Sequence, residues 1–247
     1  MSRSLLMSLA LPLLLASLAG CSVNIKGDDG IENGVAATSD LSGFKNFSGI
    51  ESAGPDNVIV TVGPAFKVTA EGDSKVLERI EIGVDGGTLK IGRKKGLNTL
   101  WSVSDKGATI RVAMPAIEKA ALTGSGDMRI GTAKGPRLTL SLTGSGDLTL
   151  GGGTLENLKA DLTGSGAMRL AGAAREVELA ATGSGDIDAS ALKAGGGSID
   201  VLGSGDVSLN SGGAVSIDIM GSGNATVRGG AKCKLSVIGS GEANCSD

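Results

Sequence analysis

The chain has no histidine and no tyrosine, and only 3 Phe and 1 Trp occur among its 247 residues. Without His it lacks the usual general base, the usual activator of a serine nucleophile and the commonest ligand of Zn, Cu and Fe. Scarce aromatics also remove the stacking platforms that bind bases and sugars. We therefore expect no catalytic residues, no metal and no cofactor.

Concentrated charge of one sign is absent too. The 23 basic and 26 acidic residues are scattered along the chain and leave a formal net charge of −3. No basic block would steer the protein onto nucleic acid, so no nucleic-acid partner is expected. Glycine, by contrast, is abundant at 42 residues. A chain of small and aliphatic side chains suits thin stacked layers better than one thick core.

The first 21 residues have the pattern of an export signal. Arg3 precedes an apolar run from Leu5 to Leu18, which is too short to span a bilayer comfortably. The run ends in Leu18-Ala19-Gly20-Cys21, which resembles the lipobox of bacterial lipoproteins. This resemblance implies a signal peptide over residues 1–20, lipidation of Cys21 and attachment to a membrane through that lipid. Ser22 at the next position implies sorting to the outer membrane. Residues 21–40 are polar and are predicted to form a flexible tether.

A repeat dominates the rest of the chain. The triplet Gly-Ser-Gly recurs at intervals of 18 to 20 residues, beginning at Gly124, Gly144, Gly164, Gly183, Gly203, Gly221 and Gly239. Apolar residues alternate on both sides of each triplet, as in Leu138, Leu140 and Leu142 before Gly144. A period of two on both sides of a glycine corner indicates two strands with one buried face.

We therefore predict an all-β solenoid, β-helix-like, in which each ~20-residue repeat is one rung stacked on the next. Regular repeats are assigned to residues 122–247. An antiparallel β meander or sandwich with Gly-Ser-Gly hairpins would show the same alternation and is the alternative. Residues 41–121 are predicted to form irregular N-terminal coils that cap the stack, with strands near Val58–Val62, Phe66–Ala70, Thr88–Ile91 and Thr109–Ala113.

Two cysteines remain besides Cys21. Cys233 and Cys245 lie six residues before and six residues after Gly239, at offsets that buried residues occupy in the other repeats. Both thiols should therefore face the interior of the last rung. In an oxidising compartment we expect them to form a disulfide, with two buried free thiols as the alternative.

The residue after most triplets is polar, and four of the seven are Asp: Asp127, Asp147, Asp186 and Asp206. Glycine and aspartate in repeats suggest calcium, but one carboxylate every 20 residues offers too few oxygen ligands for it. An Asp in a tight turn more often bonds its own backbone, so these residues are interpreted as structural.

A lipid anchor, a strand-rich entry from Phe47 to Val62, Pro115 before the first triplet and repeated Gly-Ser-Gly-Asp corners resemble one bacterial family, the auto-transporter adhesin head GIN domain. The resemblance covers about Phe44 to Cys245. It implies a right-handed β-helix-like fold and brings no catalytic residues.

The expected function is that of a non-enzymatic cell-envelope protein, an adhesin or scaffold that presents its β surface to a protein or glycan. A polysaccharide-acting β-helix enzyme is one alternative, although this chain offers only single aligned Asp residues. A periplasmic sensor or assembly factor is another, and the sequence does not separate it from an adhesin.

Overall fold

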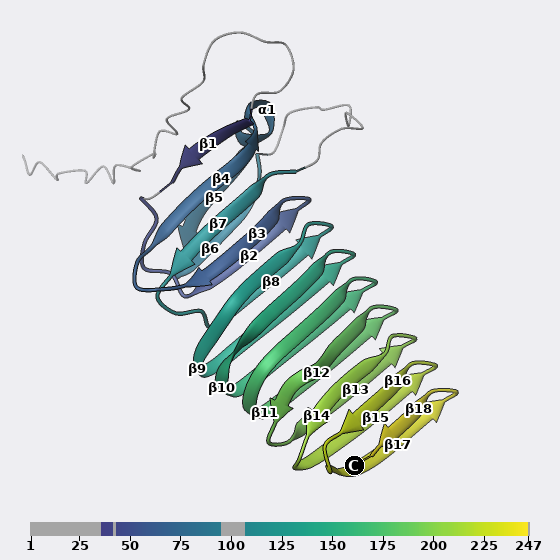
Figure 1. Ribbon diagram of the computed structural model, residues 1–247. Coiled ribbons are helices and arrows are strands. Elements are labelled where there is room, and N and C mark those ends of the chain that lie inside the picture. The colour runs from purple at the N-terminus through teal and green to yellow at the C-terminus, as the bar shows by residue number, and fades with distance from the viewer. Residues whose placement is uncertain (1–35, 42, 95–106, 247) are drawn as a thin grey trace, which may run out of the picture.

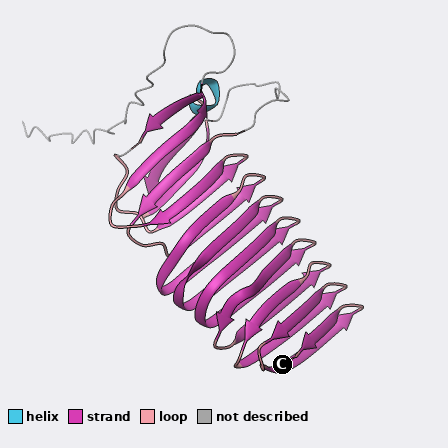
Figure 2. Cartoon of the chain, in the orientation of Figure 1, coloured by secondary structure: helices cyan, strands magenta, loops and turns pink. Residues whose placement is uncertain are grey.

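The structure is a computed structural model, and it describes residues 36–41, 43–94 and 107–246. The signal peptide, Cys21 and most of the predicted tether lie outside the described residues. Eighteen strands and one short helix stack into an elongated solenoid (Figures 1 and 2). The elements are β1 (Ala36–Asp40), β2 (Gly49–Gly54), β3 (Asn57–Val62), β4 (Lys67–Asp73), α1 (Ser74–Leu77), β5 (Ile80–Asp85), β6 (Thr88–Arg93), β7 (Thr109–Met114), β8 (Lys119–Gly124), β9 (Met128–Gly144), β10 (Asp147–Gly164), β11 (Ala167–Gly183), β12 (Asp186–Ala194), β13 (Gly197–Gly203), β14 (Val207–Ser211), β15 (Ala214–Gly221), β16 (Asn224–Arg228), β17 (Lys232–Gly239) and β18 (Glu242–Cys245).

The regular part is a parallel stack, which confirms the solenoid and rules out the antiparallel meander. β8, β9, β10 and β11 pair in parallel order, and the later rungs continue through β11–β13, β13–β15 and β15–β17. The other side of the stack runs through β12–β14, β14–β16 and β16–β18. About 6 turns result, and their spacing matches the ~20-residue repeat.

The interior is made of in-register columns of aliphatic side chains. Residues that alternate along each strand point inward, and the equivalent residue of the next rung lies directly beside each of them. One such column contains six consecutive buried residues: Leu122, Leu142, Leu162, Ala181, Val201 and Ile219. This arrangement shows how a chain poor in aromatics closes a core: each layer needs only small side chains that cover those of the layer before.

The N-terminal part does not follow the order of the chain. β2 and β3 form a rung that lies between two others: β2 pairs with β6 on one side and β8 on the other, and β3 pairs with β7 and β9. Three strands then close this end of the stack in antiparallel pairings, β5 on β6 and β4 on β7, with β1 on β4.

Two details differ from the sequence-based expectation or refine it. Ala36–Asp40, which the sequence pattern places in the tether, forms β1 and pairs with Thr69–Asp73 of β4. The turn signal Asp85-Gly86-Gly87 does join two strands, β5 and β6, and both of its glycines have positive φ. Leu77 of α1 is buried against this N-terminal cap, which ties the short helix to it.

Candidate functional site

The Gly-Ser-Gly corners stack in register and are held by backbone hydrogen bonds between rungs. The N–H groups of Ser145 and Gly146 both donate to the carbonyl of Gly124, at 3.0 and 3.2 Å. Gly144 itself has φ +128°, and a Cβ there would lie 2.3 Å from the Gly124 oxygen. The corner therefore requires glycine both for its backbone angle and for the close approach of the rungs.

The polar residues after the triplets form a ladder that Ala167 interrupts, and their hydrogen-bond partner is not the one expected from a tight turn. The Oδ1 atom of Asp127 accepts the backbone N–H of Asp147, one rung further on, at 3.2 Å. The same bond joins Asp186 to the N–H of Asp206 at 2.9 Å, and Asp206 to that of Asn224 at 3.0 Å. The N–H of the next rung lies beside the carboxylate, so the carboxylate bonds to that rung and not to the backbone of its own turn.

The ladder bears on the calcium alternative. Among the residues that the structure describes, no group of three or more Asp, Glu, Cys or His is placed to hold a metal ion. Asp127, Asp186 and Asp206 instead each have one carboxylate oxygen on a backbone N–H of the next rung, and Asp147 accepts from the Arg169 guanidinium. The column thus acts as a side-chain seam that fixes the register of successive rungs.

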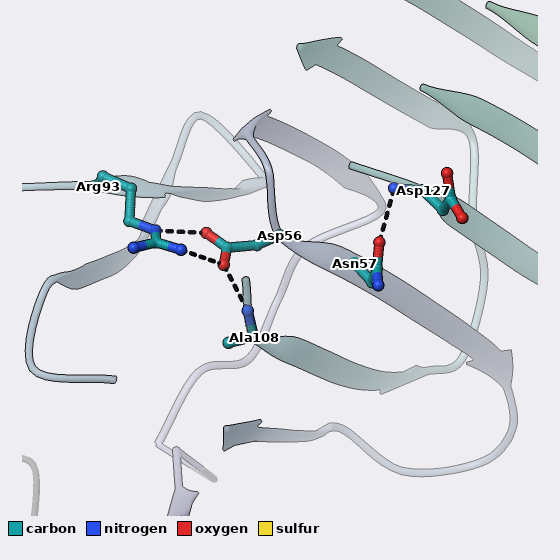
Figure 3. A network of polar contacts seen from close by, with 5 residues as sticks. All are labelled: Asp56, Asn57, Arg93, Ala108 and Asp127. Carbon is teal, nitrogen blue, oxygen red and sulfur yellow. Dashed lines mark hydrogen bonds and ion pairs between the residues drawn. The ribbon is translucent and has the colours of Figure 1, made fainter. Parts of the chain in front are cut away.

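Sequence reasoning missed an eighth corner. Gly54-Pro55-Asp56-Asn57 joins β2 to β3, and Gly54 pairs with Gly124 in register. Asn57 begins the ladder, since its Oδ1 accepts the N–H of Asp127 at 2.9 Å (Figure 3). Only the first glycine and the Asx residue match the repeat, so the motif is not visible without the register.

Asp56 stands where the other corners have their second glycine, and it is 1% exposed. Its carboxylate accepts from Arg93 through Nε at 2.7 Å and Nη2 at 2.6 Å, and from the N–H of Ala108 at 2.7 Å (Figure 3). The rung beyond it, β6 and β7, has no Gly-Ser-Gly corner, so a side chain has room there. Asp56 therefore joins the repeat to the N-terminal cap.

A shallow polar groove of about 490 Å³ runs over β12, β14, β16 and β18. Its lining is acidic and amide-rich: Asp186, Asp188, Asp206, Asn224, Glu242 and Asn244. Within it, Asp188 Oδ1 accepts from the Ser190 hydroxyl at 2.6 Å, the Ser190 N–H at 3.0 Å and the Ser208 hydroxyl at 2.8 Å. These hydrogen bonds, the Ser190 hydroxyl first, hold the pKa of Asp188 below its usual value.

The opposite sheet brings two carboxylates side by side. Asp200 of β13 pairs in register with Asp218 of β15. Partial burial, and then the charge of Asp218, raise the pKa of Asp200. The folded state thus holds the Asp200 proton more tightly than the unfolded state, so ionised Asp200 opposes folding once the pH exceeds its raised pKa.

Asp200→Asn is therefore expected to stabilise the protein slightly at pH 7. The gain should be at most about 0.5 kcal/mol, because the side chain is exposed and solvent screens the pair. It should disappear near pH 3, where a proton on Asp200 removes its charge. Urea unfolding of both proteins at the two pH values measures the difference, and a variant less stable than the parent at pH 7 would contradict the assignment.

The C-terminal end of the stack is open and apolar. Leu235, Val237 and Ile238 of β17 are 48%, 40% and 62% exposed. Leu235 and Val237 continue interior columns, whose previous members Ile217 and Ile219 are 0% and 2% exposed. Ile238 belongs to an outer row in which the exposed Thr123, Thr143, Thr163 and Thr182 are followed by Leu202 and Met220.

A disulfide joins Cys233 of β17 to Cys245 of β18, which confirms the predicted pair. The two residues continue the columns of Val215 and Val227, as their spacing around Gly239 predicts. The bridge thus connects the two sides of the rung formed by β17 and β18, which pairs with the rung of β15 and β16.

Loss of this bridge should loosen the last rung. The double variant Cys233→Ser/Cys245→Ser is expected to lose about 2 kcal/mol of local stability, because the disulfide closes a short loop in the unfolded state. Hydrogen exchange of the β17 and β18 amides should quicken while β9 and β10 stay protected. Reductant should reproduce the effect in the parent protein and leave the double variant unchanged; equal exchange in both proteins would contradict this expectation.

Parallel rungs, stacked glycine corners and a capped N-terminal end define the chain as a β-solenoid protein. Its sequence matches the family described as "Putative auto-transporter adhesin, head GIN domain" over residues 46–231, and the chain belongs to that family. This confirms the resemblance seen in the sequence. A comparison with curated proteins finds no significant match.

Solved structures show the same fold. A "putative adhesin" from Bacteroides fragilis superposes with a TM-score of 0.73 at 21% identity, covering 85% of this chain and 97% of its own. A "putative lipid binding protein" from Parabacteroides distasonis gives 0.68 at 22% identity, covering 86% and 97%. A "putative adhesin" from Parabacteroides merdae gives 0.63 at 16% identity, also covering 86% and 97%.

Proposed function

We propose that the protein is a non-enzymatic binding protein of the cell envelope, an adhesin or scaffold that holds a protein or glycan on the outer surface of its solenoid. The observation that carries the proposal is the repeated outer surface, on which equivalent side chains recur from rung to rung in fixed register, as in the polar ladder of Asp186, Asp206 and Asn224. Such a surface offers a partner many weak contacts at a regular spacing, roughly 4.8 Å.

The groove over β12, β14, β16 and β18 gathers several hydrogen-bonding side chains on this surface. Its carboxylates and amides suit a partner rich in donors, such as sugar hydroxyls or basic side chains. Family membership supports an adhesin-like role, and the two structures described as adhesins share the fold.

The anchor is part of the proposal. Lipid on Cys21 would attach the domain to the outer membrane. Each CH₂ group of an acyl chain that enters the bilayer contributes about 0.8 kcal/mol of binding free energy, and more than one chain anchors a protein stably. No helix among the described residues is long and apolar enough to cross a bilayer. A Cys21→Ala variant should leave the membrane fraction, and its retention there would contradict the lipid anchor.

Protease shaving of intact cells tests the adhesive role. The full chain carries a C-terminal tag, and a periplasmic protein serves as the control for leakage. Loss of the tag while the control survives would support binding to targets outside the cell. Protection of the tag would place the solenoid in the periplasm and would contradict adhesion to external targets.

A further inference from the structure

The two ends of the solenoid differ in a way that points to one partner. At the N-terminal end, the antiparallel strands β4 and β5 cover the outermost parallel strands β7 and β6. At the C-terminal end, β17 pairs with β15 and β18 pairs with β16, and nothing in the described part of the chain pairs with their other edges. Among the described strands, both ends therefore present strands that pair on one edge only, β1 and β5 at one end and β17 and β18 at the other. The ends differ in their apolar surface, because inward-facing Leu235 and Val237 are exposed at the C-terminal end.

Backbone donors at the open end point outward. The N–H of Lys232 donates to Gly213, and the N–H of Ser246 donates to Val227, both in the rung before. Because N–H groups alternate in direction along a strand, those of Leu235 and Val237 on β17 and of Ala243 on β18 face the open end. Free edges of this kind are templates for strand addition.

Apolar side chains lie between the two edges. Leu235 and Val237 point into the solenoid but are roughly half exposed, because no described strand covers them, and Ile238 beside them is 62% exposed. The Cys233–Cys245 disulfide holds the two edge strands together at this end. A partner that covers the surface must therefore supply two strands at the separation of β17 and β18, with apolar groups between them.

We propose that the occupant is the same end of a second copy, so that the protein forms a tail-to-tail dimer. A single extended peptide could pair with only one edge, whereas a second copy carries two edges at the same separation by construction. A two-fold axis across the solenoid brings both pairs of edges together in antiparallel fashion and covers Leu235 and Val237 of both copies. Because a two-fold contact uses the same end of both copies, it is complete at two copies and does not grow into a fibre.

This inference goes beyond the proposed function and needs neither the lipid anchor nor an external target. The surface is small, with one 8-residue edge and one 4-residue edge. Specific interfaces of standard size bury about 800 Å² on each partner, and smaller ones are transient. We therefore expect a dissociation constant on the order of micromolar.

Light scattering coupled to size-exclusion chromatography tests the dimer. The full chain is purified in excess detergent, so that the protein mass is separated from the micelle mass, and it is loaded over a range of concentrations from about 1 to 100 µM. The parent protein should shift from one copy to two across this range. A single copy at every concentration would overturn the proposal.

Two variants locate the contact. Val237→Lys would place an unpaired ammonium in the contact between the two copies and should raise the dissociation constant of the dimer at least about tenfold. Leu202→Lys is the matched control, since Leu202 is also an exposed aliphatic residue, at 50%, but lies on the outer face two rungs away. It should leave the dimer intact. If Leu202→Lys dissociates the dimer and Val237→Lys does not, the side of the solenoid is the interface and the end is not.

Hydrogen exchange on the parent protein keeps the test independent of whether Val237→Lys folds. The amides of Leu235, Val237 and Ala243 should become protected as the concentration rises, because antiparallel pairing would engage them. The amides of β9 and β10, already paired on both sides, should show no concentration dependence. Exchange at the end strands that is independent of concentration, in a protein that does dimerise, would also overturn the proposal.

Discussion

Asp56→Asn should lower the free energy of unfolding by about 3 kcal/mol, because it removes the charged member of a buried ion pair. The Asp56 side chain is 1% exposed, and its partner Arg93 is 20% exposed. The carboxylate accepts hydrogen bonds from the Arg93 guanidinium and from the N–H of Ala108, whereas the amide of asparagine has only one acceptor oxygen for these donors. Urea unfolding measures the loss.

The loss should begin in the N-terminal rungs, since solenoid stability depends on contacts between neighbouring rungs. Hydrogen exchange should quicken first in β2, β3 and β7 and leave β15 unaffected. Asp85→Asn is the matched control: Asp85 also pairs with a base, Lys90, but both side chains are more than half exposed. That variant should keep the midpoint of the parent protein. Equal midpoints for both variants would show that the Asp56 network does not hold the cap.

The repeat made the regular half of the fold predictable from the sequence. Every triplet from Gly124 to Gly239 recurs at nearly the same spacing, so alternation around one corner predicts the inward columns of all others. The disulfide followed from the same logic, because Cys233 and Cys245 lie at column positions. These inferences rest on local patterns that a parallel stack repeats.

The N-terminal rungs were not predictable in the same way. The corner at Gly54 and the next corner at Gly124 are neighbours in the stack, yet β4 to β7 lie between them in the chain. A repeat spacing in the sequence cannot show which residues of two rungs pair when several strands are inserted between them. The partner of Asp127 was misjudged for a related reason, since its acceptor atom bonds to an N–H 20 residues away.

The sequence pattern was also insufficient at the other end of the stack, as Leu235 and Val237 show. Alternation correctly predicts that Leu235 and Val237 face the interior, but it does not show that the interior is open beside them. Their exposure depends on whether another rung follows, and only the pairing of β17 and β18 reveals that none of the described strands covers them.

Gly146→Ala should be among the most damaging single-methyl additions in the protein. A Cβ at Gly146 would lie 1.9 Å from the carbonyl oxygen of Gly126 in the rung before. That oxygen belongs to the backbone, and the position of the Cβ is fixed by the backbone of Gly146, so neither atom can move away by a side-chain rotation. The rungs must separate locally or the corner must lose the hydrogen bond from Gly146 to Gly124. Overpacking of this kind costs about 3 kcal/mol.

Gly152→Ala separates this steric effect from the general effect of replacing glycine. Gly152 lies on β10 six residues further on, and a Cβ there would meet only the Thr132 methyl at 3.7 Å, an ordinary contact. Since alanine also loses less entropy on folding, that variant should match or slightly exceed the stability of the parent protein. Thermal unfolding of the two variants compares them directly. A Gly146→Ala protein as stable as Gly152→Ala would mean that the corners can relax, and that stacking does not require glycine at the third position of the triplet.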